Sequence, residues 1–321
     1  MSPVAPARSA RPALRFTLGA AAVALTVVSA TACSSSGTGE QTSSAGKKIQ
    51  VVAAENEYAD VVSQIGGQYV SVTGIMSNPN TDPHTFEANP KTAQAVGAAR
   101  LVVQNGLGYD DFMSKIEQAS SGSNRKIVDV QKVLGLPDST LNPHLWYKPT
   151  TMPAVAKTVA GDLAAIDPAH KSYFQANLTK FTTSLQSWTK ALAQLKASHP
   201  GAAVATTEPV ADYLLEAAGI KNLTPWTFQA DVMNGSDPSP QDVAYQKSLF
   251  TGHKIKAFVY NQQVTDSLTS SLLTLAKQNN IPVVGVYETM PTPGYTYQKW
   301  MNAEVTALNN ALAHGTSAPT L

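Results

Sequence analysis

Two of the six histidines lie in similar local sequences, the segments Asp82-Pro83-His84 and Asn142-Pro143-His144. In each segment a short polar residue and a proline precede the histidine, a combination typical of tight turns that fix the direction of the next side chain. Neutral imidazole is the commonest metal ligand in proteins, and a fixed approach determines which ring nitrogen faces the ion. The pair therefore predicts a metal site, with ordinary core or surface histidines as the alternative. The other histidines lie in or beside predicted helices and are interpreted as surface residues: His170, His199, His253 and His314.

The sequence lacks the common motifs of nucleotide and nucleophile sites. Neither G-x-x-x-x-G-K-[ST] nor G-x-S-x-G is present, and Gly106-Leu107-Gly108 is a lone Gly-x-Gly, which is a weak signal. The single cysteine, Cys33, cannot form an internal disulfide, a thiolate zinc site or an iron–sulfur cluster. With 23 basic and 22 acidic side chains and a formal charge of +1, the chain lacks the basic excess of a nucleic-acid-binding protein.

The first 33 residues have the organisation of an export signal. Arg8, Arg11 and Arg15 precede an apolar run over residues 16–30, and small residues then lead to Cys33. This order predicts a secretory signal peptide. The apolar run is short for a bilayer span, so a transmembrane anchor is the alternative interpretation. A lone cysteine after small residues resembles the bacterial lipobox, which implies a lipidated Cys33; an unmodified cysteine beside an ordinary cleavage site is the other possibility.

The elements that must position the histidines begin after a polar tether. Residues 34–48 are rich in Ser, Gly, Thr and Lys and cannot bury enough surface to become ordered by themselves. From Ile49 onward, strand-like runs alternate with helical ones, a pattern typical of βαβ units with a mostly parallel sheet. The predicted strands are 49–54, 69–75, 101–104 and 127–130, and the predicted helices are 58–65, 91–98 and 110–118.

Helical periodicity replaces this alternation between about residue 150 and residue 198. Asp167-Pro168 is a typical helix start, and apolar residues then recur at three- and four-residue steps as far as His199-Pro200-Gly201. A helix over residues 168–198 would be about 45 Å long, so it is interpreted as a rigid strut between two lobes. A core helix of an all-α insert is the alternative. The βα pattern then returns, with predicted strands 202–206, 256–260 and 282–287, a weaker strand 223–226, and predicted helices 210–218, 240–250, 266–278 and 295–313.

These elements predict an α/β fold with two βα lobes, each containing a mostly parallel sheet, joined by one long rigid helix. Two domains also agree with a length of 321 residues, because a single hydrophobic core stops growing near this size. The predicted segments are a signal peptide at 1–32, a lipidated cysteine and tether at 33–48, an N-terminal lobe at 49–165, a linking helix at 166–200 and a C-terminal lobe at 201–321.

The two histidine segments belong to an ordered series of motifs. The series is Asn56-Glu57-Tyr58-Ala59-Asp60, Gln64-Ile65-Gly66-Gly67, Thr81-Asp82-Pro83-His84-Thr85-Phe86-Glu87, Asn105-Gly106-Leu107-Gly108 and Asn142-Pro143-His144-Leu145-Trp146. Together these segments resemble the metal-binding lipoproteins of cluster A-I ABC transporters, the manganese and zinc receptor family. The resemblance extends over residues 49–313. It implies a metal ion held between the lobes by four side chains, and delivery of that ion to a permease in the membrane.

The resemblance also assigns the four ligands. His84 and His144 correspond to the two ligands of the N-terminal lobe. Glu208, in the turn after the strand at 202–206, corresponds to the third, which is Glu or His in the family. Glu288 is the carboxylate in the loop after the last strand, where the family usually has Asp. Other carboxylates of the C-terminal half are the substitutes: Asp231, Asp237 and Asp266.

Two imidazoles and two carboxylates form a chemically coherent set. Their charge of −2 compensates a divalent cation, and the ends of strands in open α/β sheets are where such folds bind small partners. Trp146 and Trp226 could form a dry surrounding shell or belong to the core. Oxygen-rich sites suit manganese, whereas the divalent affinity order favours zinc. Zinc members of the family that the chain resembles often carry a histidine-rich loop after the first histidine. Residues 89–141 contain no histidine, so the resemblance favours manganese, with zinc next and ferrous iron as a further possibility.

The function predicted from these features is that of a non-enzymatic, monomeric solute-binding lipoprotein, anchored through Cys33 to the outer face of the cell membrane. It would capture manganese or zinc and deliver the ion to an ABC permease. A metal-dependent extracellular hydrolase is the alternative from another class, but a catalytic metal needs an open coordination position. Four protein ligands leave little room for one. A surface adhesin has no support beyond the anchor.

Overall fold

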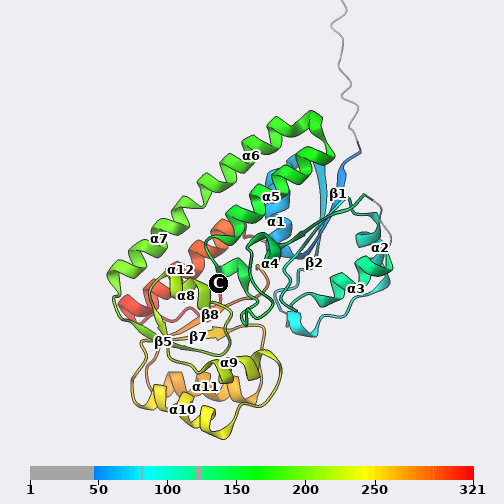
Figure 1. Ribbon diagram of the computed structural model, residues 1–321. Coiled ribbons are helices and arrows are strands. Elements are labelled where there is room, and N and C mark those ends of the chain that lie inside the picture. The colour runs from blue at the N-terminus through cyan, green and yellow to red at the C-terminus, as the bar shows by residue number, and fades with distance from the viewer. Residues whose placement is uncertain (1–46, 81, 121–123, 292) are drawn as a thin grey trace, which may run out of the picture. The chain divides into compact units, whose positions relative to one another are not determined.

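The computed structural model describes residues 47–80, 82–120, 124–291 and 293–321, and these form two parallel sheets with helices on both faces (Figure 1). The predicted α/β fold class is therefore confirmed. Cys33, the predicted signal peptide and most of the predicted tether lie outside the described residues. None of the helices in the described ranges combines the length and apolarity needed to cross a bilayer.

The N-terminal sheet has the strand order β2-β1-β3-β4, and every strand pair is parallel. Val51 and Ala53 face one side of this sheet and Val52 and Ala54 the other, as the pleat of a strand requires. All four are buried because helices cover both faces of the sheet. The strands are β1 (Ile49–Glu55), β2 (Val70–Met76), β3 (Leu101–Gln104) and β4 (Lys126–Asp129).

Different helices cover the two faces of the N-terminal sheet. Val96 and Met113 bring α2 and α3 against one face, and Tyr58 and Val155 bring α1 and α5 against the other. The helices are α1 (Asn56–Gly66), α2 (Pro90–Ala98), α3 (Asp111–Ala119), α4 (Val130–Val133) and α5 (Thr151–Ile166). Short 3-10 turns are η1 (Gly67–Tyr69), η2 (Pro83–Thr85), η3 (Leu145–Tyr147) and η4 (Pro168–His170).

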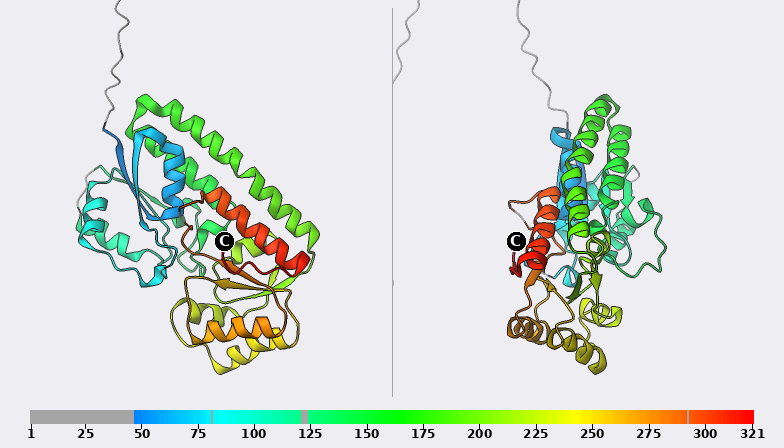
Figure 2. Two further views of the ribbon diagram at one scale, coloured as in Figure 1. Left: turned by 180° about the vertical axis from the view of Figure 1, so that it is seen from behind. Right: turned by 90° about the vertical axis from the view of Figure 1, so that its left-hand side faces the viewer.

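The C-terminal sheet repeats this topology, with the strand order β6-β5-β7-β8 and parallel pairing throughout. Phe228, Leu249 and Leu272 bring α9, α10 and α11 against one face, and the other face lies on α8 and α12 (Figure 2). The strands are β5 (Ala203–Thr206), β6 (Lys221–Asn222), β7 (Ala257–Asn261) and β8 (Val283–Val286). The helices are α8 (Asp212–Ala217), α9 (Trp226–Met233), α10 (Pro240–Thr251), α11 (Ser267–Gln278) and α12 (Tyr297–His314).

The predicted strand at 223–226 is wrong. Strand β6 ends at Asn222, and Trp226 begins helix α9, which the sequence pattern does not predict. The side-chain oxygen of Asn222 accepts a hydrogen bond from the backbone N–H of Thr224 at 3.0 Å, so the chain turns directly after the strand. Pro225 then precedes the helix in an extended conformation.

The linking helix is present as two consecutive helices, α6 (Lys171–Ser184) and α7 (Gln186–Ser198), which together form one rod along the molecule (Figure 1). Leu185 separates them. Hydroxyl side chains just before this point bond to the helix backbone, with Thr182 donating to the Leu178 carbonyl at 2.9 Å and Ser184 to the Phe181 carbonyl at 2.6 Å. Such bonds compete with the helical ladder, which accounts for the interruption.

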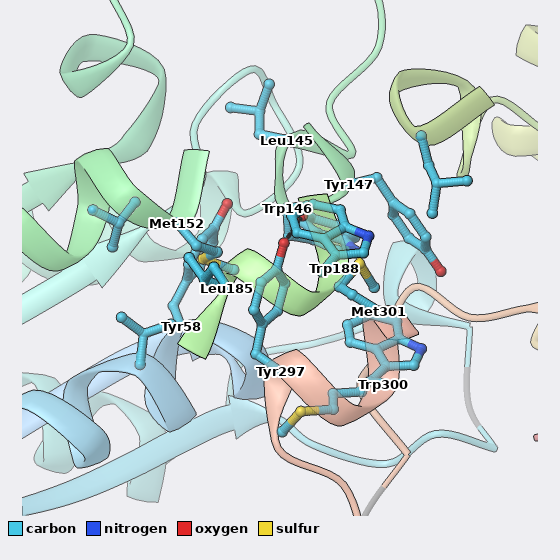
Figure 3. Close-up of a cluster of buried hydrophobic side chains, with 14 of the residues drawn as sticks. Tyr58, Leu145, Trp146, Tyr147, Met152, Leu185, Trp188, Tyr297, Trp300 and Met301 are labelled. Atoms are coloured by element: carbon cyan, nitrogen blue, oxygen red, sulfur yellow. Dashed lines mark hydrogen bonds between the residues drawn. The ribbon is translucent and has the colours of Figure 1, made fainter. Parts of the chain in front are cut away.

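One hydrophobic cluster continues from the N-terminal sheet through α5, α6, α7 and α12 to the C-terminal sheet. Figure 3 shows its aromatic centre, in which Trp146, Trp188, Tyr297 and Trp300 lie together. The rings of Trp188 and Tyr297 are 5.8 Å apart edge to face, and the Tyr297 hydroxyl donates to the Trp146 carbonyl at 2.6 Å. The two sheets therefore share a core on their inner sides, while each has a separate core on its outer side.

Candidate metal centre

Three of the four predicted ligands follow the carboxyl ends of strands, and the fourth, His144, lies in the loop after α4. His84 lies in η2 after β2, His144 directly precedes η3, Glu208 comes two residues after β5, and Glu288 comes two residues after β8. Ligands of open parallel sheets bind at these strand ends. The side chains of His144 and Glu288 are fully buried and Glu208 is 2% exposed, whereas the His84 side chain retains 22% exposure.

Both histidines are presented by the same type of turn. The Asp82 side chain accepts a hydrogen bond from the backbone N–H of His84 at 2.8 Å, and the Asn142 side chain accepts one from the backbone N–H of His144 at 3.0 Å. In each case the intervening proline fixes the backbone angle of the turn. The sequence repeat therefore corresponds to a repeated geometry.

The Asn142 amide also orients the His144 ring. Its oxygen lies 2.8 Å from Nδ1 of His144, and its nitrogen donates to the Pro209 carbonyl at 2.8 Å, so the oxygen side faces the imidazole. Nδ1 therefore carries the hydrogen, and Nε2 is directed into the centre. This arrangement, in which the second ring nitrogen is held by a neighbour, is typical of metal-binding histidines.

Three groups converge on one oxygen of Glu288. Nε2 of His84 and Nε2 of His144 each lie 3.2 Å from Glu288 Oε2, and the Tyr109 hydroxyl donates to the same oxygen at 3.1 Å. One ligand atom each from His84, His144 and Glu288 lie within 4.8 Å of one another. Within the part of the chain that the structure describes, this is the one group of three or more such residues arranged to hold a metal ion.

Glu208 lies beside this group and is connected to it through Asn261. The Asn261 amide nitrogen donates to Glu288 Oε1 at 2.7 Å and to Glu208 Oε1 at 3.1 Å. The structure thus brings three of the predicted ligands into contact and places the fourth one hydrogen-bonded residue away. All four remain predicted ligands.

Burial and charge give the four side chains different proton affinities. Burial opposes the charged form of His84, but the hydrogen bond and charge of Glu288 outweigh it and raise the pKa of His84. Burial lowers the pKa of His144. Burial also opposes ionisation of Glu288, but the hydrogen bonds of both histidines hold the pKa of Glu288 well below its ordinary value. Burial, followed by the charge of Glu288, raises the pKa of Glu208 well above its ordinary value. Protons therefore compete with a cation for His84 and Glu208, and the competition increases as pH falls.

The loop that carries Glu288 is fixed from both sheets. The Gln263 side-chain oxygen accepts the backbone N–H groups of Glu288 and Thr289 at 2.6 and 2.9 Å. From the other side, the Asn56 amide forms two hydrogen bonds with the backbone of Met290, donating at 2.8 Å and accepting at 3.0 Å. These contacts hold the backbone of Glu288 and of the two residues after it. The position of the Glu288 carboxylate therefore depends on residues far away in the chain.

The Gly106-Leu107-Gly108 segment forms a turn beside the centre. Gly106, Leu107 and Gly108 have φ values of 81°, 55° and 79°, in the left-handed region that favours glycine. The Asp110 carboxylate accepts the backbone N–H groups of Asn105 at 2.6 Å and Gly106 at 2.9 Å. This turn holds Tyr109 against the centre. Burial of the Asp110 carboxyl raises its pKa to about 6.

Of the two tryptophans predicted to surround the site, only Trp146 contacts it. Its ring lies 5.4 Å from the His144 ring and 5.0 Å from that of Tyr109, edge to face in both cases. Trp226 is half-buried at the start of α9 and lines a surface groove with Leu141 and Tyr213.

The substitute carboxylates Asp231, Asp237 and Asp266 do not join the group of three. Asp266 caps α11, with its side chain accepting the backbone N–H of Thr269 at 2.6 Å.

Sequence reasoning missed the amides that hold the centre together, namely Asn261 and Gln263. Asn261 ends the buried strand β7 and is 1% exposed, and a polar residue at such a strand end is a signal that could have identified it. Tyr109 directly follows the Asn105–Gly108 motif, and this position is a signal that could have identified it as well. The donor set of two imidazole nitrogens and two carboxylates suits a divalent transition metal.

The comparisons with known proteins agree with this chemistry. The family model described as zinc-uptake complex component A, periplasmic, matches residues 51–311. The chain is 23% identical over 273 residues to the manganese ABC transporter substrate-binding lipoprotein PsaA of Streptococcus anginosus, covering 81% of this chain and 85% of that protein. It is 25% identical over 268 residues to the manganese-binding lipoprotein MntA of Bacillus subtilis, covering 80% and 84%. The solved structure of the periplasmic zinc-binding protein TroA of Treponema pallidum matches with a TM-score of 0.71 at 21% identity, covering 84% of this chain and 100% of that one.

Proposed function

This chain belongs to the family of zinc-uptake complex component A proteins, and we propose that it captures manganese or zinc outside the cytoplasmic membrane and delivers the ion to an ABC permease for import. The relatives named as manganese-binding lipoproteins of ABC transporters support this function. Ferrous iron has similar ligand requirements and is a further candidate cargo.

The observation that carries the proposal is the convergence of His84, His144 and Glu288 within 4.8 Å, with His144 and Glu288 buried and His84 partly exposed. We infer that these residues and Glu208 are the four ligands. Two neutral imidazoles and two carboxylates give the occupied centre a protein charge of −2, which a divalent cation neutralises. Burial excludes water and strengthens the attraction between the ion and the carboxylates.

The partly exposed edge of His84 supports a role for this residue in first contact with the ion. The other three ligands are at most 2% exposed, so an incoming ion meets the His84 imidazole before it reaches the buried carboxylates. We propose that the protein binds its cargo stoichiometrically and performs no turnover.

We propose that Cys33 carries a lipid anchor, that residues 1–32 are a signal peptide and that residues 33–48 form a tether. The N-terminal lobe, linking helix and C-terminal lobe then span 49–165, 166–200 and 201–321. The protein would act as a monomer on the outer face of the cell membrane. The basic residues, the apolar run and the single cysteine support this arrangement.

Elemental analysis of the protein purified from its native host, without added metal, tests the cargo. We expect about one manganese or zinc ion per chain, and no hydrolysis of generic ester or peptide substrates. A protein that contains neither metal, and binds neither in titration at neutral pH, would contradict the proposal.

Cell fractionation tests the anchor. The Cys33→Ser variant should move from the membrane fraction to the soluble fraction, because it lacks the thiol that is lipidated. If the variant remains as firmly membrane-bound as the parent, Cys33 is not the anchor.

A further inference from the structure

We propose that Asn261 leaves each carboxylate of the centre one free oxygen and thereby favours a four-coordinate ion such as zinc over manganese. This inference rests on the proposed function, because it takes Glu208 and Glu288 to be ligands.

The Asn261 amide contacts both carboxylates at once. Its nitrogen donates to Glu288 Oε1 at 2.7 Å and to Glu208 Oε1 at 3.1 Å, and the side chain lies at the end of β7 with 1% exposure. An amide nitrogen has two hydrogens, so one hydrogen serves each carboxylate. Both hydrogens are thereby used on oxygens of the centre.

Neighbouring backbone contacts fix the direction of this amide. Its oxygen accepts the backbone N–H of Gln263 at 3.0 Å, and the backbone N–H of Asn261 itself donates to the Thr207 hydroxyl at 3.0 Å. A reversed amide would place its oxygen against two carboxylate oxygens and its nitrogen against an N–H group. The nitrogen therefore faces the carboxylates, independently of any metal.

The second oxygen of each carboxylate, Oε2, is not hydrogen-bonded to Asn261 and has other surroundings. Glu288 Oε2 is the atom on which His84 and His144 converge at 3.2 Å, and it also accepts a hydrogen bond from the Tyr109 hydroxyl at 3.1 Å. Glu208 Oε2 is buried and has no hydrogen-bond partner among the residues that the structure describes. Each carboxylate thus has its Oε1 held by Asn261, and its Oε2 is the oxygen left to a cation, on Glu288 because both imidazole nitrogens face it and on Glu208 because it is buried without a partner among the described residues.

Single-oxygen binding by both carboxylates limits the protein ligands to four atoms, two nitrogens and two oxygens. Zinc is commonly four-coordinate with such ligands, whereas manganese prefers more numerous oxygen ligands in octahedral geometry. Removal of the amide would free Oε1 of both carboxylates, which could then bind through two oxygens. Asn261 is therefore a positioning residue that acts on selectivity through the two carboxylates.

The test compares the zinc and manganese affinities of the parent, Asn261→Ala and a matched control, Asn222→Ala. Asn222 is also an asparagine of the C-terminal sheet that donates to a carboxylate, Asp212 at 2.9 Å, but it contacts none of the four ligands. Changes to residues that hold ligands commonly alter metal affinity by about 10- to 100-fold. We expect the zinc-to-manganese affinity ratio to fall by about tenfold or more in Asn261→Ala and to stay unchanged in Asn222→Ala.

X-ray absorption on the zinc-loaded parent gives a second readout that needs no variant. Four nitrogen or oxygen neighbours are expected, and five or six would overturn the inference even if Asn261→Ala fails to fold. An unchanged affinity ratio in Asn261→Ala, with both metals still bound, would overturn the role of Asn261 alone. A parent that binds neither metal would overturn the proposed function together with this inference.

Discussion

The two halves of the candidate centre are constructed in different ways. In the histidine half, the backbone N–H of each histidine is held by a residue two positions earlier, Asp82 or Asn142, within a proline-containing turn. In the carboxylate half, Gln263 binds the backbone N–H of Glu288 from 25 residues away, and Asn56 binds the backbone of Met290 from 234 residues away in the chain. The comparison teaches that local sequence can determine the direction of a ligand, whereas the distance between ligands depends on the complete fold.

The largest expected effect comes from removal of either imidazole. His84→Ala or His144→Ala should abolish most of the metal-dependent stabilisation, which for the parent is about 2.7 kcal/mol when the metal is at 100 times its dissociation constant. Thermal unfolding with and without manganese or zinc measures this effect. His170→Ala is the control, because His170 pairs with Asp167 outside the centre. If the melting temperature of the parent responds to neither metal, the prediction that His84 and His144 are metal ligands is wrong.

Acidification should weaken metal binding strongly. The pKa values of His84 and Glu208 are raised, so protons compete with the ion for these two side chains, and apparent affinity falls as pH falls through these pKa values. Each displaced proton contributes about tenfold in affinity per pH unit.

Calorimetric titration in buffers of different ionisation enthalpy counts the released protons. Glu208→Gln should release fewer protons than the parent, because its amide cannot titrate. Equal proton release from the two proteins would show that Glu208 takes no part in the coupling.

The two local turns can be compared directly by Asn142→Ala and Asp82→Ala. Asn142 accepts from both the backbone and the ring of His144, whereas the Asp82 side chain accepts the backbone N–H of His84. We expect Asn142→Ala to reduce metal affinity by about 10- to 100-fold and Asp82→Ala to reduce it less. Isothermal titration of both variants with zinc measures the difference, and a larger loss in Asp82→Ala would reverse the interpretation.

The smallest effect concerns metal preference in the carboxylate half. Glu208→His would replace a hard oxygen by a softer nitrogen and change the charge of the centre from −2 to −1. Manganese affinity should fall while zinc affinity holds or rises. Competitive titration of both metals in one buffer gives the ratio; if it equals that of the parent, Glu208 is not a ligand.

The sequence predicted most of the fold because hydrophobic patterning reports local burial. Strand β3 was predicted at its observed bounds, Leu101–Gln104, and both faces of the sheets are covered as continuous apolar runs require. The prediction of a strand at 223–226 was wrong because the Asn222 side chain binds the backbone N–H of Thr224 and the chain turns after β6. Hydrophobic patterning does not detect such a contact.

Part of the candidate site could also be predicted from the sequence. The histidine half is visible as a repeated Asx-Pro-His segment, and its turns are present. The assignment of Glu208 and Glu288 needed the family resemblance, and Asn261 was missed. Its importance arises only when the ends of β5, β7 and β8 are brought together. Tertiary contacts of this kind have no local signature.

The shared inner core has a consequence for the way the protein unfolds. Trp188 from the rod and Tyr297 from α12 pack edge to face, and Tyr297 also bonds to the Trp146 backbone, so neither sheet can lose its inner helices without exposing the other. The two lobes should therefore melt as a single cooperative unit, despite their repeated topology. Differential scanning calorimetry of the metal-free protein would then record one transition, with equal calorimetric and van't Hoff enthalpies.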